Sequence, residues 1–291
     1  MNKKEKSMST RKLVNNIIVH VFLTVLAIIW VLPIAWVVLT AFRKEPGSYL
    51  TYIMPKGYTL DNFINLLTKT NVINFPRWFM NTLIVAICSC IISTFFVLSV
   101  SYCMSRLRFS FRKTYMNIAL ILGMFPGFMS MIAVYYILKG IGLIDGPGAL
   151  KLLSLVIVYS AGAGLSFYVA KGFFDTIPKA LDEAAYLDGA TKFQVFTKVT
   201  MPLSKPIIVY TILTTFMAPW LDFIFAKVII GTNTKYYTVA IGLWNLLERE
   251  YIYKYFTQFA AGAVLVSIPV AVLFMFMQKY YVDGLSGAVK G

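Results

Sequence analysis

The stretch Glu183-Ala184-Ala185-Tyr186-Leu187-Asp188-Gly189-Ala190, closed by Met201-Pro202-Leu203, decides how this chain is interpreted. It belongs to a polar, helix-forming island, residues 175–206, that lies between two long apolar runs. Hydrocarbon does not tolerate irregular backbone, and long connections without any structure of their own are uncommon. We therefore predict that this island is an ordered loop outside the bilayer, where a partner protein can bind.

The composition places the rest of the chain in a membrane. Hydrophobic residues make up 59% of the sequence and charged residues only 13%, which is far from the composition of a soluble domain. Six apolar runs are each close to or beyond the ~20 residues that cross a bilayer as a helix. They are Ile17 to Phe42, Thr82 to Met104, Tyr115 to Leu138, Leu152 to Ala170, Ile207 to Ile230 and Phe259 to Tyr280. The sequence predicts an all-α, polytopic integral membrane protein with six transmembrane helices.

The net charge of +15 is distributed as a membrane topology requires, and not as a nucleic-acid-binding surface. Six spans put both termini on one side, together with residues 105–113 and 171–206. The segments on that side hold 16 of the 27 Lys and Arg residues, and loop 105–113 carries four of them without any acid. Short loops follow the positive-inside rule best, so both termini are predicted to be cytoplasmic.

The chain is predicted to have three parts. Residues 1–76 form an N-terminal tail, a first transmembrane helix and an outside loop with a short helix at Leu60 to Leu67. Residues 77–280 form the transmembrane core, and residues 281–291 form a cytoplasmic tail with too little apolar surface to fold alone. The first apolar run is too long for a signal peptide and lacks a small-x-small cleavage site, so we expect it to be retained.

Few residues are candidates for catalysis or metal binding. Cys88, Cys90 and Cys103 all lie in the second apolar run without metal-ligand spacing, and His20 is the one histidine of the chain. Packing roles suit all four residues. We expect no catalytic residue and no metal site.

The polar island is predicted to contain two short helices. Thr176 suits the cap of the first helix, and Pro178 suits its first turn. Leu181, Ala184, Ala185 and Asp188 fall on one helix face, whose mostly small side chains would let the helix enter a cleft. Gly189 supplies the left-handed residue that ends this helix.

A second helix follows the reversal at Gly189. Thr191 and Gln194 match a capping box, and Pro202 and Pro206 mark the end of this helix before the next apolar run. The alternative is a solvated loop that only connects two spans. We favour a docking element over this alternative, because a rigid pair of helices at the membrane surface can bind a partner and transmit force to the spans.

The combination of Glu183, Ala184, Ala185, Gly189 and Pro202 resembles the loop through which membrane subunits of ABC importers touch their ATPase subunits. Three further stretches carry the same resemblance: Phe79 to Leu83, Ser101 to Phe109, and the tail from Gln278 to Gly291 with its ending Gly284-Leu285-Ser286-Gly287-Ala288-Val289-Lys290-Gly291. The chain is similar to permease subunits of ABC sugar importers, and in particular to the second membrane subunit of maltose-type systems. The type I importer permease fold is what this resemblance implies.

The resemblance also implies partners and site residues. It implies a heterodimer with a second permease, two cytoplasmic ATPase subunits and an extracytoplasmic sugar-binding protein, in the bacterial cytoplasmic membrane. The residues expected to couple the loop to the ATPase are Glu183, Ala184, Ala185, Asp188, Gly189 and Pro202. The tail residues expected to contact the ATPase are Gly284, Gly287 and Lys290. ATP and Mg²⁺ are expected on the partner ATPase, and this chain is expected to bind no cofactor and to be no enzyme. Independently, the sequence contains no Gly-x-x-x-x-Gly-Lys-Ser/Thr loop.

The resemblance implies that the translocated substrate is an oligosaccharide. The tail sequence favours maltose or maltodextrin, and galactan-derived sugars are the alternative. Asp222 is the one acid in the body of a span and lies near Trp220, so both are candidates for the translocation path. A structural role for Asp222, with Lys227 as a loose partner, is the favoured alternative. The rival function is a self-sufficient secondary transporter, which normally needs several ionisable groups within the membrane.

Overall fold

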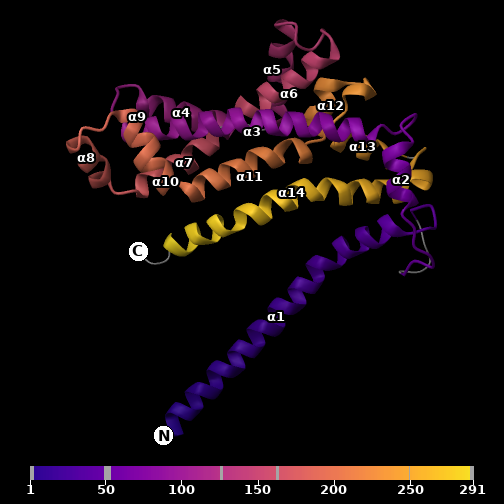
Figure 1. The fold of residues 1–291 in the computed structure, drawn as a ribbon, viewed down its shortest axis with the longest axis horizontal. Coiled ribbons are helices and arrows are strands. Elements are labelled where there is room, and N and C mark those ends of the chain that lie inside the picture. Colours follow the sequence, from indigo (N-terminus) through magenta and orange to yellow (C-terminus); the bar gives the residue numbers. More distant parts are fainter. Residues whose placement is uncertain (1–2, 49–53, 125–126, 162–163, 249, 289–291) are drawn as a thin grey trace. The chain divides into compact units, whose positions relative to one another are not determined.

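The computed structural model describes residues 3–48, 54–124, 127–161, 164–248 and 250–288 (Figure 1). These residues form helices and their connections, with one isolated β-bridge between Arg43 and Tyr58. The all-α fold class is therefore confirmed. The chain divides into two compact units, Met1–Thr68 with Leu246–Leu265, and Lys69–Asn245 with Val266–Gly291.

The first unit contains α1 (Lys3–Phe42), α2 (Asp61–Thr68) and the beginning of α14 (Ile252–Ala288). Apolar side chains along α1 are exposed, as expected of a helix that faces lipid. The short helix predicted at Leu60 to Leu67 is present as α2. The Asn62 side chain fixes α2 to the end of α1, since its Nδ2 donates to the carbonyl oxygens of Ala41 at 2.9 Å and Arg43 at 2.7 Å.

The second unit is a group of helices around α3 (Phe75–Arg106), which packs along α6, α7 and α11 (Figure 1). Its other helices, in chain order, are α4 (Arg112–Gly123), α5 (Gly127–Gly140), α6 (Gly148–Ala161), α7 (Gly164–Thr176), α8 (Lys179–Leu187), α9 (Lys192–Gln194), α10 (Met201–Leu203), α11 (Lys205–Leu221), α12 (Ile224–Ile230), α13 (Val239–Asn245) and the remainder of α14. A π-helix, Val195–Thr200, joins α9 to α10, and a 3₁₀ turn, Thr234–Tyr236, precedes α13.

Within the described residues, three helical stretches are long and apolar enough to cross a membrane: Asn15–Phe42, Phe75–Arg106 and Ile252–Tyr280. Two bent pairs of helices could each form a further span, α6 with α7, and Lys192–Leu203 with α11. The single helix predicted over 207–230 is divided in two, because Asp222 adopts an extended backbone conformation after α11. The single helices predicted over 115–138 and 152–170 contain residues 125–126 and 162–163, which lie outside the described residues.

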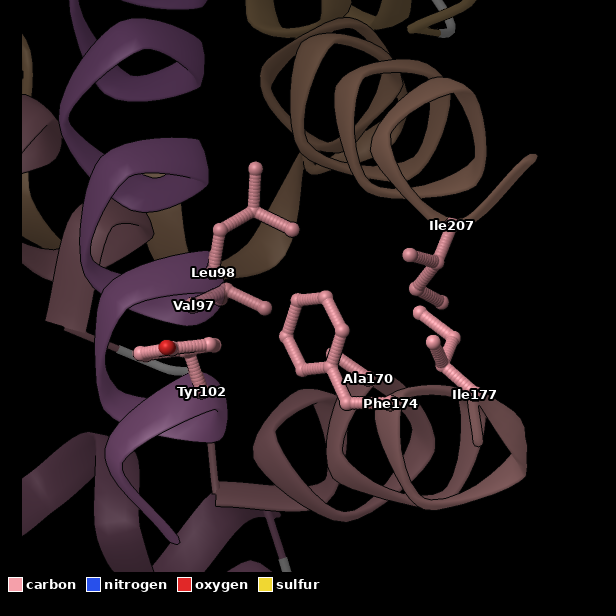
Figure 2. Close-up of a cluster of buried hydrophobic side chains, with 7 residues drawn as sticks. All are labelled: Val97, Leu98, Tyr102, Ala170, Phe174, Ile177 and Ile207. Carbon is pink, nitrogen blue, oxygen red and sulfur yellow. The ribbon is translucent and has the colours of Figure 1, made fainter. Parts of the chain in front are cut away.

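A buried apolar cluster at one end of the second unit positions the polar island (Figure 2). It joins side chains of α3, α7, the connection after α7, and α11, namely Val97, Leu98, Tyr102, Ala170, Phe174, Ile177 and Ile207. Phe174 lies in its centre, and the Tyr102 ring meets it edge-on at a centroid distance of 6.2 Å. Phe196 of the polar island extends the cluster, since its ring lies 4.6 Å from that of Tyr102. The island is therefore packed onto the helix ends.

Candidate functional site

The polar island, which we call the coupling loop (residues 175–206), lies at the end of the second unit where α3 ends and α11 begins (Figure 1). Its first helix, α8, begins at Lys179, so Pro178 is the N-cap residue with a non-helical backbone and does not lie in the first turn, where the sequence predicted it. The predicted cap by Thr176 is wrong. Thr176 is the last residue of α7, and its hydroxyl donates to the Phe173 carbonyl at 2.7 Å. This local bond competes with a cap on the next helix.

Gly189 ends α8 as predicted. Its φ of +83° is in the left-handed region, and two backbone bonds close the turn, from Gly189 to Tyr186 at 3.0 Å and from Ala190 to Ala185 at 2.9 Å. These bonds form a Schellman motif, which satisfies carbonyls at the helix end. An added Cβ at Gly189 would meet no atom within 4 Å, so backbone conformation alone selects glycine here.

The capping box predicted for the second helix is confirmed. Gln194 N donates to Thr191 Oγ1 at 3.3 Å, and Thr191 N donates to Gln194 Oε1 at 2.8 Å. The helix then widens into the π-helix, in which Met201 N donates to Phe196 O, five residues earlier. Pro202 has no N–H for the carbonyl four residues earlier, so regular α-helical bonding cannot continue through it.

The coupling loop turns sharply into the following span. Residues Lys192–Leu203 and α11 meet at an angle of 82°. Ser204 lies at this corner, fully buried, and its hydroxyl donates to the Thr200 carbonyl at 2.6 Å. Pro206 lies in the first turn of α11, where a proline fits. The predicted end of the second helix is confirmed.

One side of the coupling loop is open to solvent. Leu187 is 90% exposed and Phe193 is 72% exposed, which is unusual for large apolar side chains on an ordered polar loop. Glu183, Ala184, Asp188, Gly189 and Pro202 are also exposed, while Ala185 is half-buried. Most residues that the sequence singles out are thus at the surface, and we call Glu183, Ala184, Leu187 and Phe193 the docking face.

The opposite side of α8 is held by an ion pair that the sequence reasoning missed. Asp182 Oδ2 lies 3.1 Å from Arg106 Nε at the end of α3, and the two side chains are 9% and 4% exposed. Arg106 Nη2 also donates to the Ile177 carbonyl at 2.8 Å. Asp182 and Glu183 lie about 100° apart around α8, so one is buried while the other is exposed, and no local signal in the sequence identified Arg106 as the partner of Asp182.

A second polar contact joins α3 to α7. Ser105 of α3 donates to Asp175 Oδ1 of α7 at 2.6 Å, and Lys171 Nζ, also in α7, lies 2.5 Å from Asp175 Oδ2. The ends of α3 and α7 are therefore linked by a charged hydrogen bond as well as by the apolar cluster. Such bonds are shorter and stronger than neutral ones. The base of the coupling loop is fixed, and its docking face is free.

Asp222 lies in the short connection between α11 and α12, and its side chain makes two hydrogen bonds. Its Oδ1 accepts from Phe225 N at 3.0 Å, and its Oδ2 accepts from the Tyr159 hydroxyl of α6 at 2.7 Å. Lys227 does not pair with it, because the Lys227 ammonium contacts the Tyr237 hydroxyl at 3.2 Å. These contacts support the structural role that the sequence favoured for Asp222.

Trp220 is also a packing residue in this structure. It is 3% exposed, and its ring meets that of Phe79 edge-on at 5.2 Å and that of Phe216 at 6.0 Å. Its ring therefore packs between α3 and α11, and its place in the translocation path stays a prediction.

The C-terminal residues continue α14 to Ala288, so Gly284 and Gly287 lie in a helix. The sequence predicts that residues 281–291 cannot fold alone. Extension of an existing helix avoids the unfavourable nucleation step, which explains the difference. Lys290 lies outside the described residues.

Comparison with known proteins agrees with this architecture. Residues 97–287 match the family of binding-protein-dependent transport system inner membrane components. The chain is 33% identical to the galactooligosaccharides transport system permease protein GanQ of Bacillus subtilis, over 98% of this chain and 99% of the relative. It is also 33% identical to the maltodextrin transport system permease protein MdxG of Bacillus subtilis, over 97% of this chain and 99% of the relative.

Solved structures agree with the fold. A chain in the crystal structure of a bacterial ABC transporter involved in the import of the acidic polysaccharide alginate matches with a TM-score of 0.75 at 20% identity, covering 97% of this chain and 99% of that chain. This likeness supports the type I permease fold. The chain therefore belongs to the family of binding-protein-dependent transport system inner membrane components.

Proposed function

We propose that this chain is one of two different permease subunits in an ATP-driven importer of oligosaccharides in the bacterial cytoplasmic membrane. Family membership and the named relatives support this proposal. The relatives named for galactooligosaccharides and for maltodextrin are equally identical to the chain, so the substrate class is better supported than either sugar. The tail sequence favours maltodextrin as the first candidate.

The docking face of the coupling loop is the observation that carries the proposal. Leu187 and Phe193 expose apolar surface beside the exposed carboxylate of Glu183, while the other side of α8 is anchored by Asp182. A helix that presents apolar and small residues is suited to binding in a hydrophobic groove. We assign the groove to a cytoplasmic ATPase subunit, which binds ATP and Mg²⁺ and performs the hydrolysis.

Force from the ATPase then reaches the spans through packed contacts. Movement of α8 acts on α3 through Asp182 and Arg106, and on α7 and α11 through the cluster around Phe174. Close-packed interiors transmit displacements because they have low compressibility. Rigid-body motion of the two permeases would open the path first to an extracytoplasmic sugar-binding protein and then to the cytoplasm.

Measurement of sugar uptake by reconstituted vesicles tests this function. The complex of this chain with its second permease and its ATPase should take up radiolabelled maltodextrin or galactooligosaccharides only with ATP on the ATPase side and with the sugar-binding protein on the other. Uptake driven by an ion gradient without ATPase subunits would contradict the proposal and identify a secondary transporter. Comparison of the two sugars at equal concentration decides the substrate.

A further inference from the structure

A basic cavity lies between α4 and α7, beside the base of the coupling loop. Its volume is about 270 Å³, and its lining residues are Arg112, Lys113, Met116, Asn117, Tyr168 and Lys171. Three cations thus converge on one cavity, together with a side-chain amide and a phenol ring. Apart from Lys171, whose pair with Asp175 helps to fix the base of the coupling loop, these residues have no part in the proposed transport cycle.

The positive charge of this cavity is only partly neutralised. Lys171 pairs with Asp175 at 2.5 Å, and Asp175 also lies within electrostatic reach of Arg112. Among the described residues, Arg112 and Lys113 form no ion pair of their own. One acid therefore faces three cations. The first turn of α4, which begins at Arg112, adds the positive end of a helix dipole.

The walls of the cavity are held in place. The Tyr168 hydroxyl donates to the Met116 carbonyl at 2.8 Å, which joins α7 to α4 directly. Further along the two helices, Gly164 permits close approach, since a Cβ there would lie 2.6 Å from the Ala119 carbonyl oxygen. The cations therefore converge on a preformed site.

Beyond the cavity, both helices carry exposed apolar side chains. Ile121 of α4 is 61% exposed, and Leu165 of α7 is 63% exposed. A free anion such as inorganic phosphate would fill the cavity and leave this apolar surface uncovered. A phospholipid carries both an anionic headgroup, which matches the basic cavity, and acyl chains, which match the apolar surface beyond it.

We propose that this cavity binds the phosphate-bearing headgroup of an anionic phospholipid, with its acyl chains along the apolar surface of α4 and α7. Arg112, Lys113 and Lys171 contact the phosphate, and Asn117 donates to the headgroup oxygens. Basic pockets between spans on the cytoplasmic side recognise anionic lipids in this way. The inference rests on the proposed function for the cytoplasmic placement of this end.

Native mass spectrometry of the purified importer complex tests the site. The complex is exchanged from phosphatidylcholine into mixtures with phosphatidylglycerol, and the retained lipid is counted. The pocket variant replaces Arg112, Lys113 and Lys171 by Gln. A matched control variant replaces three exposed lysines away from the cavity by Gln, namely Lys69, Lys139 and Lys235.

We expect the wild type and the control to retain phosphatidylglycerol at least ten-fold more strongly than the pocket variant. Equal retention by the wild type and the pocket variant would overturn the proposal. Displacement of the lipid by millimolar inorganic phosphate would show a site for the free anion, and would also overturn it. Should the pocket variant fail to assemble, the single change Lys113→Gln at an exposed position should still weaken retention, and unchanged retention would refute the site. Because no ATP or sugar is needed, failure here leaves the transport assignment standing.

Discussion

Arg106 Nε and Asp182 Oδ2 lie 3.1 Å apart and join the end of α3 to α8 in a buried ion pair. The neighbouring acid, Glu183, is exposed. Two successive carboxylates of one helix therefore have different tasks, one holding α8 on the membrane helices and the other available to a partner.

Arg106→Met should disorder the coupling loop, because it leaves the Asp182 carboxylate buried without its partner. Breaking one side of a buried pair typically destabilises by about 3–5 kcal/mol. Hydrogen exchange of the amides in residues 177–204 should become faster. The control Lys171→Met breaks a partly exposed pair, where about 0–1 kcal/mol is expected. The double variant Arg106→Met with Asp182→Leu should recover most of the protection, and wild-type exchange in Arg106→Met alone would refute the anchoring role.

Gly189→Ala should destabilise the turn after α8 by about 1 kcal/mol, because alanine is strained at a φ of +83°. Gly189→Val should have a larger effect and should reduce both ATPase association and transport. Gly172→Ala is the matched control, since an added Cβ also meets no atom within 4 Å there and φ is not positive. Thermal unfolding of the three variants makes the comparison. Intact association and transport in Gly189→Val would show that the turn does not position the docking face.

Asp222→Asn should reduce transport only modestly. The amide keeps an acceptor for Phe225 N, and its NH₂ can donate to the Tyr159 hydroxyl oxygen, so most of the link between α6 and α12 survives. Uptake and sugar-stimulated ATP hydrolysis are measured in the same vesicles. If uptake vanished while assembly and ATP hydrolysis stayed normal, Asp222 would be a substrate residue instead.

Deletion of residues 284–291 should leave a membrane-inserted chain whose ATPase partner responds weakly to the sugar-binding protein. The deleted part is the last turn of α14 and the residues beyond it, which we propose to lie at the ATPase interface through Gly284, Gly287 and Lys290. Steady-state ATP hydrolysis with and without sugar measures the response. A truncated complex with full, sugar-dependent stimulation would remove the tail from the mechanism.

Local sequence signals predicted the turns of the coupling loop well, because capping motifs depend on neighbours in the chain. The roles of Gly189, Thr191 and Gln194 are all in place. The cap by Thr176 failed because the preceding helix extends far enough to engage the same hydroxyl. The π-helix at Val195–Thr200 was not predicted, since no residue pattern distinguishes it from an α-helix.

Contacts between segments that are distant in the chain could not be predicted from the sequence. Arg106 and Asp182 are separated by two apolar runs, and nothing in either neighbourhood identifies the other as its partner. The break at Asp222 in the span predicted over 207–230 was missed for a related reason, because apolarity shows that a segment lies in the membrane and not whether its helix is continuous. Asp222 was recognised as unusual from the sequence, while its two hydrogen-bond partners required the structure.

Site-specific photo-crosslinking tests whether the docking face binds the ATPase subunit. A photo-crosslinking amino acid replaces Leu187, which is 90% exposed, or Trp244 in α13, which is 52% exposed, in the assembled complex. We expect a covalent product with the ATPase subunit from position 187 and none from position 244, and a weaker product from position 187 when Glu183→Ala is added. Crosslinks from position 187 to the sugar-binding protein, or none to the ATPase in a complex that hydrolyses ATP, would contradict it.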